Sequence, residues 1–497
     1  MPFRTRRVGV CSGELCIHKL TSRQYLCYYR MLSVYLGEDV FLKGVARYLK
    51  THAFTNAETN DLWKALGHVS GLDIPGLMSV WTLNVGYPII KVTEDNNTIY
   101  VEQNRYLRTG PATAEQDRVV WPIMLGLQAD LSTNQKLLLN SRKGVIPLPS
   151  SDFFKLNTAH SGVYRVLYSE TRLAKLAHAA SCGKLSAADR AGLLYDSISL
   201  TQSGHQALAG TFDLVRSLYY DSSYFVWQAL LTWFTSLSST WIFTSDEKLK
   251  AAIRRVQLDF TARQSHELGL APSKNDDVID ALFKPLLFTA AGCSGNAPSI
   301  HTARNMFAKF VDGDRAAIPK DLRAAVFSIV LHADGAAKEY NMVLKEFEKD
   351  ATTVDERSAA ISALGYATSP VLIARTIDLA LDVNRMPNTM LQSLLSGLST
   401  HAAGVEALFD TLLNRYDDVA KRFQGGLGSR SRLLPSYCRG LATDKQGDRL
   451  EAFFAGKDTK GFVRALTQTI EEIRIKAAWA KRDEHALREW LTTHGYY

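Results

Sequence analysis

The stretch GYPIIKVTEDNNTIYVEQNRYL (residues 86–107) marks the point where the sequence changes from one kind of structure to another. Before it, apolar residues recur every three or four positions, which is typical of helices. Within it, Pro88 restricts its own backbone and favours an extended Tyr87, and short apolar runs follow on both sides of the turn residues Glu94 to Asn97. The change predicts that a helical segment ends here and that strands begin.

Short runs of this kind continue downstream as VVWPIMLGLQ, QKLLLNS and SGVYRVLYS, so we expect a small β-sandwich over residues 88–168. Upstream, residues 30–87 have the apolar spacing of helices. Thr59 stands where a capping residue is needed at the start of one of these helices. Asp73, followed by Pro75, is the expected start of the next.

The helical pattern returns at Ser169 and continues to the end of the chain. Ser186 with Asp189 three residues on resembles a capping box. Further along, helices start at Asp321, Asp355 and Asn388, at intervals close to those of stacked helical hairpins. We therefore predict a mainly α protein with a small β-sandwich, in which residues 169–497 form a HEAT-like α-solenoid.

Length and composition restrict the class of protein. The 497 residues exceed what one hydrophobic core usually serves, so several domains are expected. The net charge of +8 comes from basic residues interleaved with acidic ones, and no nucleic-acid-binding motif is present, so we expect no nucleic-acid partner. Six irregularly spaced cysteines are typical of reduced thiols, which predicts a cytoplasmic location.

Two other classes of site are weighed against the sequence. Residues 222–245 carry no charge, but their Ser and Thr content and scattered aromatics favour a buried helix, and we predict no membrane contact. None of the 12 histidines forms the His-x-x-x-His pair that lets one helix face hold zinc. His266 precedes Glu267, but Leu270 stands where the second ligand is needed. The cluster of Cys11, Cys16, His18 and Cys27 matches no standard zinc spacing. The residues alone therefore predict no catalytic and no metal site.

Several longer stretches nevertheless resemble one family. They are RMLSVYLGEDVFLKGVARYLKTHAFTNAETNDLWKALGHVSG, MSVWTLNVGYPII, FKLNTAHSGVYRVLYS, LSAADRAGLLYDSISLTQSG and TQTIEEIRIKAAWAKRDEHALREWL. The sequence from Arg30 onward resembles the zinc aminopeptidases of the aminopeptidase N, puromycin-sensitive and endoplasmic-reticulum type. The resemblance implies that residues 30–87 are the last helices of a thermolysin-like catalytic domain. It also implies a β-sandwich third domain and a bowl-shaped helical fourth domain.

The same resemblance implies a missing active site. The family's Gly-Ala-Met-Glu-Asn and His-Glu-x-x-His motifs are absent here, and Ser22 falls where the family has its transition-state tyrosine. We expect residues 1–29 to be unrelated to the family or disordered, through truncation, gene splitting or a wrong first exon. Zinc is the cofactor of the full-length family, and no cofactor is expected for this chain.

Three functions follow as hypotheses. In the first, the chain is a carboxy-terminal portion of a zinc aminopeptidase, inactive alone, with a peptide-binding or regulatory surface to which Arg422, Arg430 and Arg432 contribute. In the second, it is an α-solenoid scaffold for a partner protein. In the third, it completes an active aminopeptidase with a separate catalytic chain. We also expect Leu36, Phe41 and Trp63 to be partly exposed and to favour a partner.

Overall fold

The computed structural model describes residues 22–95, 97–130, 132–148, 153–269, 277–333, 336–422 and 429–497. The chain is mainly helical, as predicted, with small sheets confined to one region. It divides into two compact units, Met1–Leu230 and Leu231–Tyr497, and each is described by itself.

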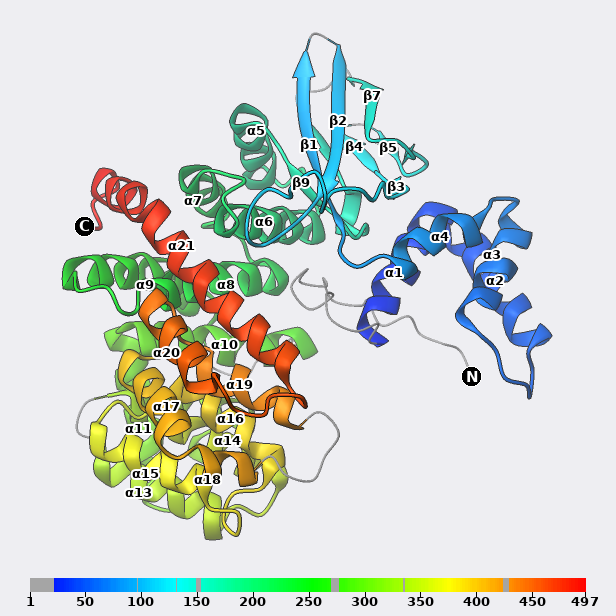
Figure 1. Cartoon of the computed structure of the whole chain (residues 1–497). Coiled ribbons are helices and arrows are strands. Elements are labelled where there is room, and N and C mark those ends of the chain that lie inside the picture. The colour runs from blue at the N-terminus through cyan, green and yellow to red at the C-terminus, as the bar shows by residue number, and fades with distance from the viewer. Residues whose placement is uncertain are drawn as a thin grey trace. The chain divides into compact units, whose positions relative to one another are not determined.

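The first unit begins with four helices, drawn in blue in Figure 1: α1 (Ser22–Leu36), α2 (Glu38–Thr51), α3 (Thr59–Ser70) and α4 (Ile74–Leu83). Helix α1 starts eight residues before Arg30, where the apolar pattern places the first helix. Cys27 and Tyr28 on its second turn are buried. The first turn of α1 is polar and has no apolar residues at helical spacing, so the spacing of apolar residues does not reveal where this helix begins. Residues 1–21 of the segment expected to be unrelated or disordered lie outside the described residues.

Of the two capping residues predicted for these helices, one is confirmed and one is wrong. Asp73 caps α4 as predicted, since its Oδ1 accepts a hydrogen bond from the Gly76 amide at 2.9 Å. The prediction for Thr59 is wrong, because Glu58 is the N-cap of α3. Glu58 and Asp61 form a reciprocal capping box, in which the Glu58 amide donates to Asp61 Oδ2 at 3.0 Å.

The apolar residues expected to be exposed are mostly covered. Leu36 and Trp63 are buried, and Phe41 is half-buried. The expectation is therefore wrong for the first two. The ring of Trp63 lies against that of Tyr29 within the helical segment.

All nine strands of the described residues lie between Pro88 and Leu167, inside the segment predicted to be strand-rich. β1 and β2 form a long antiparallel hairpin (Figure 1) in a sheet of order β7-β2-β1-β9, in which β9 runs parallel to β1. A second sheet has the order β5-β4-β8, and a third pairs β3 with β6. The bounds are β1 Pro88–Asp95, β2 Thr98–Arg105, β3 Ile123–Met124, β4 Leu127–Ala129, β5 Thr133–Asn134, β6 Leu138–Leu139, β7 Lys143–Pro147, β8 Phe154–Leu156 and β9 Arg165–Leu167.

Helices follow the strands: α5 (Glu170–Ser181), α6 (Ala187–Gln202), α7 (Leu208–Ser217) and α8 (Tyr224–Thr240). Ser186 caps α6 as predicted, because its hydroxyl accepts from the Asp189 amide at 3.1 Å. Helix α8 occupies the uncharged stretch, and Trp227 and Leu230 on it are buried. No single helix of the described part is long and apolar enough to span a membrane. The bent pair of α10 (Val278–Ser294) and α11 (Ala297–Val311) passes that test by length and composition.

The second unit is built from helices whose bounds are α9 Glu247–Leu268, α10 Val278–Ser294, α11 Ala297–Val311, α12 Arg323–His332, α13 Ala337–Lys345, α14 Val354–Leu364, α15 Pro370–Leu381, α16 Asn388–Leu398, α17 Ala402–Asn414, α18 Tyr416–Arg422, α19 Ser429–Cys438, α20 Asp444–Phe454 and α21 Val463–Thr493. Alternate helices are neighbours: α10 packs on α12, α12 on α14, α14 on α16, and α15 on α17. A continuous apolar core runs from α10 to α21. Three of these helices, α12, α14 and α16, start within two residues of the starts predicted from the repeat.

Candidate functional site

The first predicted peptide-binding residue, Arg422, ends α18 and is buried. One Nη2–H of its guanidinium donates to the Met386 carbonyl at 2.5 Å, and its Nε has no hydrogen-bond partner among the described residues. Burial lowers the pKa of this arginine, whereas Tyr437 and Asp382 act in the opposite direction. The hydroxyl of Tyr437 is also buried without a partner in the described part. The guanidinium of Arg422 and the hydroxyl of Tyr437 therefore interact electrostatically, and each keeps a donor without a hydrogen-bond partner in the described part.

The other two predicted arginines lie on the next helix. Arg430 is in the first turn of α19, and its side chain is outside the described part. Arg432 is exposed, and no carboxylate of the described residues lies within ion-pair distance of it. The three arginines thus come from one short region. Arg422 and Arg432 differ in burial, and the role of all three in binding stays a prediction.

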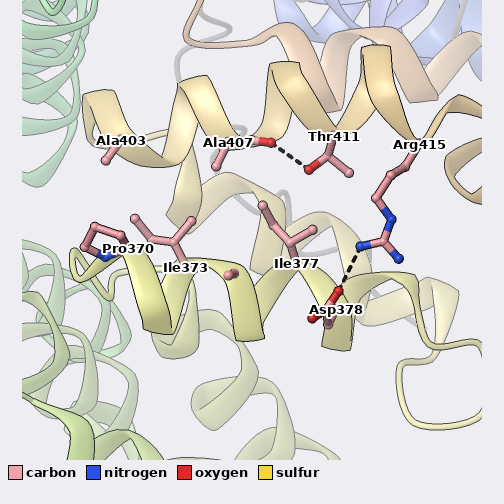
Figure 2. A pocket seen from close by; sticks show the side chains of 9 residues that line it. Pro370, Ile373, Ile377, Asp378, Ala403, Ala407, Thr411 and Arg415 are labelled. Carbon is pink, nitrogen blue, oxygen red and sulfur yellow. Dashed lines mark hydrogen bonds and ion pairs between the residues drawn. The ribbon is translucent and has the colours of Figure 1, made fainter.

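A groove of about 300 Å³ lies in the same unit between α15 and α17 (Figure 2). Its floor is apolar and buried, with Ile373 and Ile377 contributed by α15. The side chains around it are small or apolar except at one end. The lining residues are Pro370, Ile373, Ala374, Ile377, Asp378, Ala403, Ala407, Thr411 and Arg415.

The polar end of the groove is an ion pair between Arg415 Nη1 and Asp378 Oδ1, 2.8 Å apart (Figure 2). The hydrogen bond with Asp378 raises the pKa of Arg415. Nε of the same guanidinium lies 3.5 Å from Asp418, whereas Nη2 has no partner in the described part. Arg415 and Arg422 both act electrostatically on the pKa of Tyr437, so the groove end and Arg422 belong to the same region of the unit. No motif in the sequence marks Arg415 as a binding residue, although its separation of 37 residues from Asp378 is close to the helical repeat.

The first unit contains a separate cluster of buried charge around strand β8 and helix α6. Lys155 Nζ lies 2.9 Å from Asp189 Oδ1, and Arg165 Nη1 lies 3.2 Å from Asp196 Oδ1, with all four side chains nearly inaccessible. Lys155 Nζ also donates to the Leu156 and Asn157 carbonyls at 3.1 and 2.8 Å. The charges therefore compensate one another, as buried charges must, although Asp189 Oδ1 accepts no hydrogen bond among the described residues.

The loop beside this cluster has an unusual backbone. Asn157, Ala159 and His160 have φ values of 59°, 54° and 48°, a region that side-chain-bearing residues rarely adopt. Arg30 of α1 donates to the Ala159 carbonyl at 2.7 Å. His160 packs so closely on α6 that a Cβ at Gly192 would lie 2.2 Å from its Cγ. Burial lowers the pKa of His160 to about 3, helped by Lys155, Arg165 and Arg30.

The described residues do not fit a zinc site. No three His, Cys, Asp or Glu side chains among them gather closely enough to hold a metal ion. Ser22 is the first residue of α1, and its side chain is not described. Cys11, Cys16 and His18 lie outside the described residues.

Comparison with known proteins identifies the family. The model of the ERAP1-like C-terminal domain matches residues 153–475, and the model of the Peptidase family M1 domain matches residues 24–81. Aminopeptidase 2 of Candida albicans is 35% identical over 469 residues, which are 94% of this chain and 50% of that protein. In Saccharomyces cerevisiae, alanine/arginine aminopeptidase is 32% identical over 94% of this chain and 54% of the relative. Aminopeptidase 2, mitochondrial, of the same yeast is 33% identical over 94% of this chain and 49% of its own length.

A mainly helical chain with a small strand-rich region, matched by the Peptidase family M1 model before its strands and by the ERAP1-like model after most of them, defines the class, the C-terminal portion of an M1 peptidase. The chain belongs to the M1 aminopeptidase family. It spans about half the length of the curated relatives it matches. One of those relatives is named as mitochondrial, and the cytoplasmic location of this chain stays a prediction.

Proposed function

We propose that this chain is the C-terminal portion of a zinc aminopeptidase that binds peptides through its second unit and does not hydrolyse them by itself. The groove between α15 and α17 carries the proposal, because it combines an apolar floor with a cationic end. Ligand sites typically pair an apolar lining with a few placed polar groups. A peptide would lay apolar side chains over Ile373 and Ile377 and present its terminal carboxylate to Arg415, with Arg422 and Arg432 contributing positive charge nearby.

Two observations support a HEAT-like solenoid as the frame of this groove. Alternate helices contact one another in sequence order along the unit. In addition, four ion pairs join side chains 37 to 39 residues apart: Arg385–Glu348, Arg415–Asp378, Arg449–Asp410 and Lys481–Asp444. Such a constant separation is expected when each helical repeat bonds to the one before it. The same stacked surface would serve a scaffold for a partner protein, which is the second candidate function.

The absence of hydrolysis is proposed from the sequence. Peptide hydrolysis in this family needs a metal that polarises the carbonyl and activates water. The 497 residues contain no His-x-x-x-His pair, and Ser22 stands at the position expected for the family's tyrosine. The purified chain should release no fluorophore from aminoacyl substrates and should hold no stoichiometric zinc. Chelator-sensitive turnover with about one zinc per chain would show that this part of the proposal is wrong.

Peptide binding is tested by fluorescence anisotropy with the full chain. The probe is a labelled peptide with an apolar last residue, used with a free carboxylate and as the C-terminal amide. Arg415→Gln should weaken binding of the free acid about tenfold, since hydrogen bonds to charged groups contribute about 1.5–3 kcal/mol. Arg449→Gln is the matched control, because Arg449 forms a similar exposed ion pair outside the groove. Equal affinity of the acid and the amide, or equal effects of the two substitutions, would contradict the assignment.

A further inference from the structure

The last turn of α18 carries a positive charge that is removed from water. Arg422 is 3% exposed, and its Nη2–H donates to the Met386 carbonyl at 2.5 Å. The buried Nε–H of the same guanidinium has no hydrogen-bond partner among the described residues. Taking a charge out of water is costly, so a buried cation normally lies against a negative group. Arg422 therefore requires a counter-ion.

The carboxylates near Arg422 are engaged elsewhere. None of those in the described part lies within ion-pair distance of its guanidinium. Asp382, whose charge opposes the effect of burial on the pKa of Arg422, accepts with Oδ1 from the backbone amide of Asn384 at 2.9 Å. Asp418, on the same helix as Arg422, lies 3.5 Å from two other basic side chains. The described carboxylates thus leave the charge of Arg422 without a direct partner.

A second buried donor belongs to α19, which contacts α18. Tyr437 is 1% exposed, and its hydroxyl has no hydrogen-bond partner in the part of the chain that the structure describes. Burial raises the pKa of this phenol, so the hydroxyl stays protonated at neutral pH and can donate. Arg422 lies near enough to act on that pKa. Two neighbouring donors, one of them charged, are therefore buried without an acceptor among the described residues.

We propose that Arg422 and Tyr437 together bind a monatomic anion, for which chloride is the probe. Both groups donate hydrogen bonds, so the ligand is an acceptor. A water molecule would satisfy the donors and leave the guanidinium charge uncompensated, whereas an anion meets both requirements. Because the two residues are covered, a peptide carboxylate or a phosphate ester cannot reach them without displacing the surrounding side chains.

This inference goes beyond the proposed peptide site and does not depend on it. The peptide carboxylate is assigned to Arg415, which is exposed at the end of the groove, whereas the anion is assigned to a covered position. The two assignments are tested with different probes. Loss of peptide binding therefore leaves the anion site standing, and loss of the anion effect leaves the groove standing.

The experiment compares sodium chloride with sodium gluconate, whose anion is too large for a covered site, at the same ionic strength of about 0.15 M. Thermal unfolding of the full chain gives the stability in each salt. The line width of the chloride NMR signal, measured on the folded chain, reports binding directly. Tyr437→Phe removes one of the two donors. Tyr340→Phe is the matched control, because Tyr340 is also 1% exposed but its hydroxyl is bonded to Thr376 Oγ1 at 2.9 Å.

In chloride we expect the unchanged chain to gain about 2–4 °C in unfolding temperature relative to Tyr437→Phe, a difference that gluconate does not produce. In gluconate the variant should be no less stable than the unchanged chain, since it removes a buried hydroxyl that has no partner in the described part. Tyr437→Phe should need about tenfold more chloride for the same line broadening. General effects of the two salts act on all chains alike and cancel in the comparison.

Three outcomes would overturn the inference. The first is a chloride signal that the unchanged chain does not broaden, which would mean that water serves the two donors, and this result needs no variant to fold. The second is an equal response of Tyr437→Phe and the unchanged chain to the change of salt. The third is an equal loss of the chloride effect in Tyr340→Phe, which would show that the loss of any buried hydroxyl is sufficient.

Discussion

Ion pairs between distant residues occur in both units, and two pairs in the first unit differ sharply in burial from two in the second. In the first unit, Lys155–Asp189 and Arg165–Asp196 are buried and link strands β8 and β9 to helix α6. In the second, pairs such as Arg415–Asp378 and Arg449–Asp410 lie on the surface between successive repeats. Breaking a buried pair leaves a charge without water or partner, whereas breaking an exposed pair lets water replace the lost contact. The two buried pairs therefore contribute strongly to the stability of the first unit, whereas exposed pairs such as Arg415–Asp378 remain accessible to a ligand.

The largest effect is expected from breaking the Lys155–Asp189 pair. Lys155→Met leaves the Asp189 carboxylate buried without its cation, and the first unit should lose about 3–5 kcal/mol of unfolding free energy. The measurement is urea unfolding of the full chain, followed by hydrogen exchange in residues 88–230. Replacing both partners, Lys155→Met with Asp189→Leu, should cost markedly less. If the double variant is as unstable as the single one, packing rather than charge accounts for the loss.

A pH effect of intermediate size is expected from His160. Its pKa is about 3 in the folded chain, below the value of about 6.5 in an unfolded one, so the unfolded state alone takes up a proton as the pH falls below 6.5. Stability must therefore decrease with falling pH, and we expect the first unit to be about 1–2 kcal/mol less stable at pH 5 than at pH 7 from this group.

The test compares the unchanged chain with His160→Gln, which cannot titrate. As the pH falls from 7 to 5, the unfolding free energy of the unchanged chain should decrease relative to that of His160→Gln, because only His160 takes up a proton on unfolding. Parallel pH profiles for both chains would show that His160 is hydrated enough to keep its ordinary pKa.

A smaller effect is expected where α1 meets the strand region. Lys136 Nζ donates to the Tyr35 and Leu36 carbonyls at 2.5 and 3.1 Å, the last acceptors of α1. A cation at a helix C-terminus is favourable, so Lys136→Met should cost about 1 kcal/mol. Amides in the last turn of α1 should then exchange faster. Lys143→Met, which breaks only an exposed contact with Glu102, is the control and should leave α1 unchanged.

The sequence predicts local structure better than it predicts these pairs. The change of period at Pro88, the caps Asp73 and Ser186, and the helical repeat from α12 to α16 all follow from residues close to one another in the chain. Asp189 appears in the sequence only as a capping-box residue. Its partner Lys155 is 34 positions away on a strand, and nothing in either neighbourhood pairs the two.

The sequence likewise predicts some features of the candidate site and not others. The arginines near α18 and α19 are visible as charges in a loop-like stretch, but a sequence gives no burial, so Arg422 and Arg432 look alike. The groove between α15 and α17 depends on two helices packing side by side, which periodicity alone does not specify.

The smallest effect is expected from the surface pairs of the second unit. Replacing Arg449 by Gln removes its contact with Asp410, 3.3 Å away, where both side chains are about half exposed. Exposed pairs contribute about 0.2–1 kcal/mol, because the ions stay hydrated and long side chains lose freedom in pairing. Urea unfolding should therefore change by less than about 1 kcal/mol, and the difference should vanish in 1 M salt, where screening extends over only about 3 Å. A loss near that of Lys155→Met would mean that the surface pairs hold the repeats together cooperatively, and the contrast between the two units would fail.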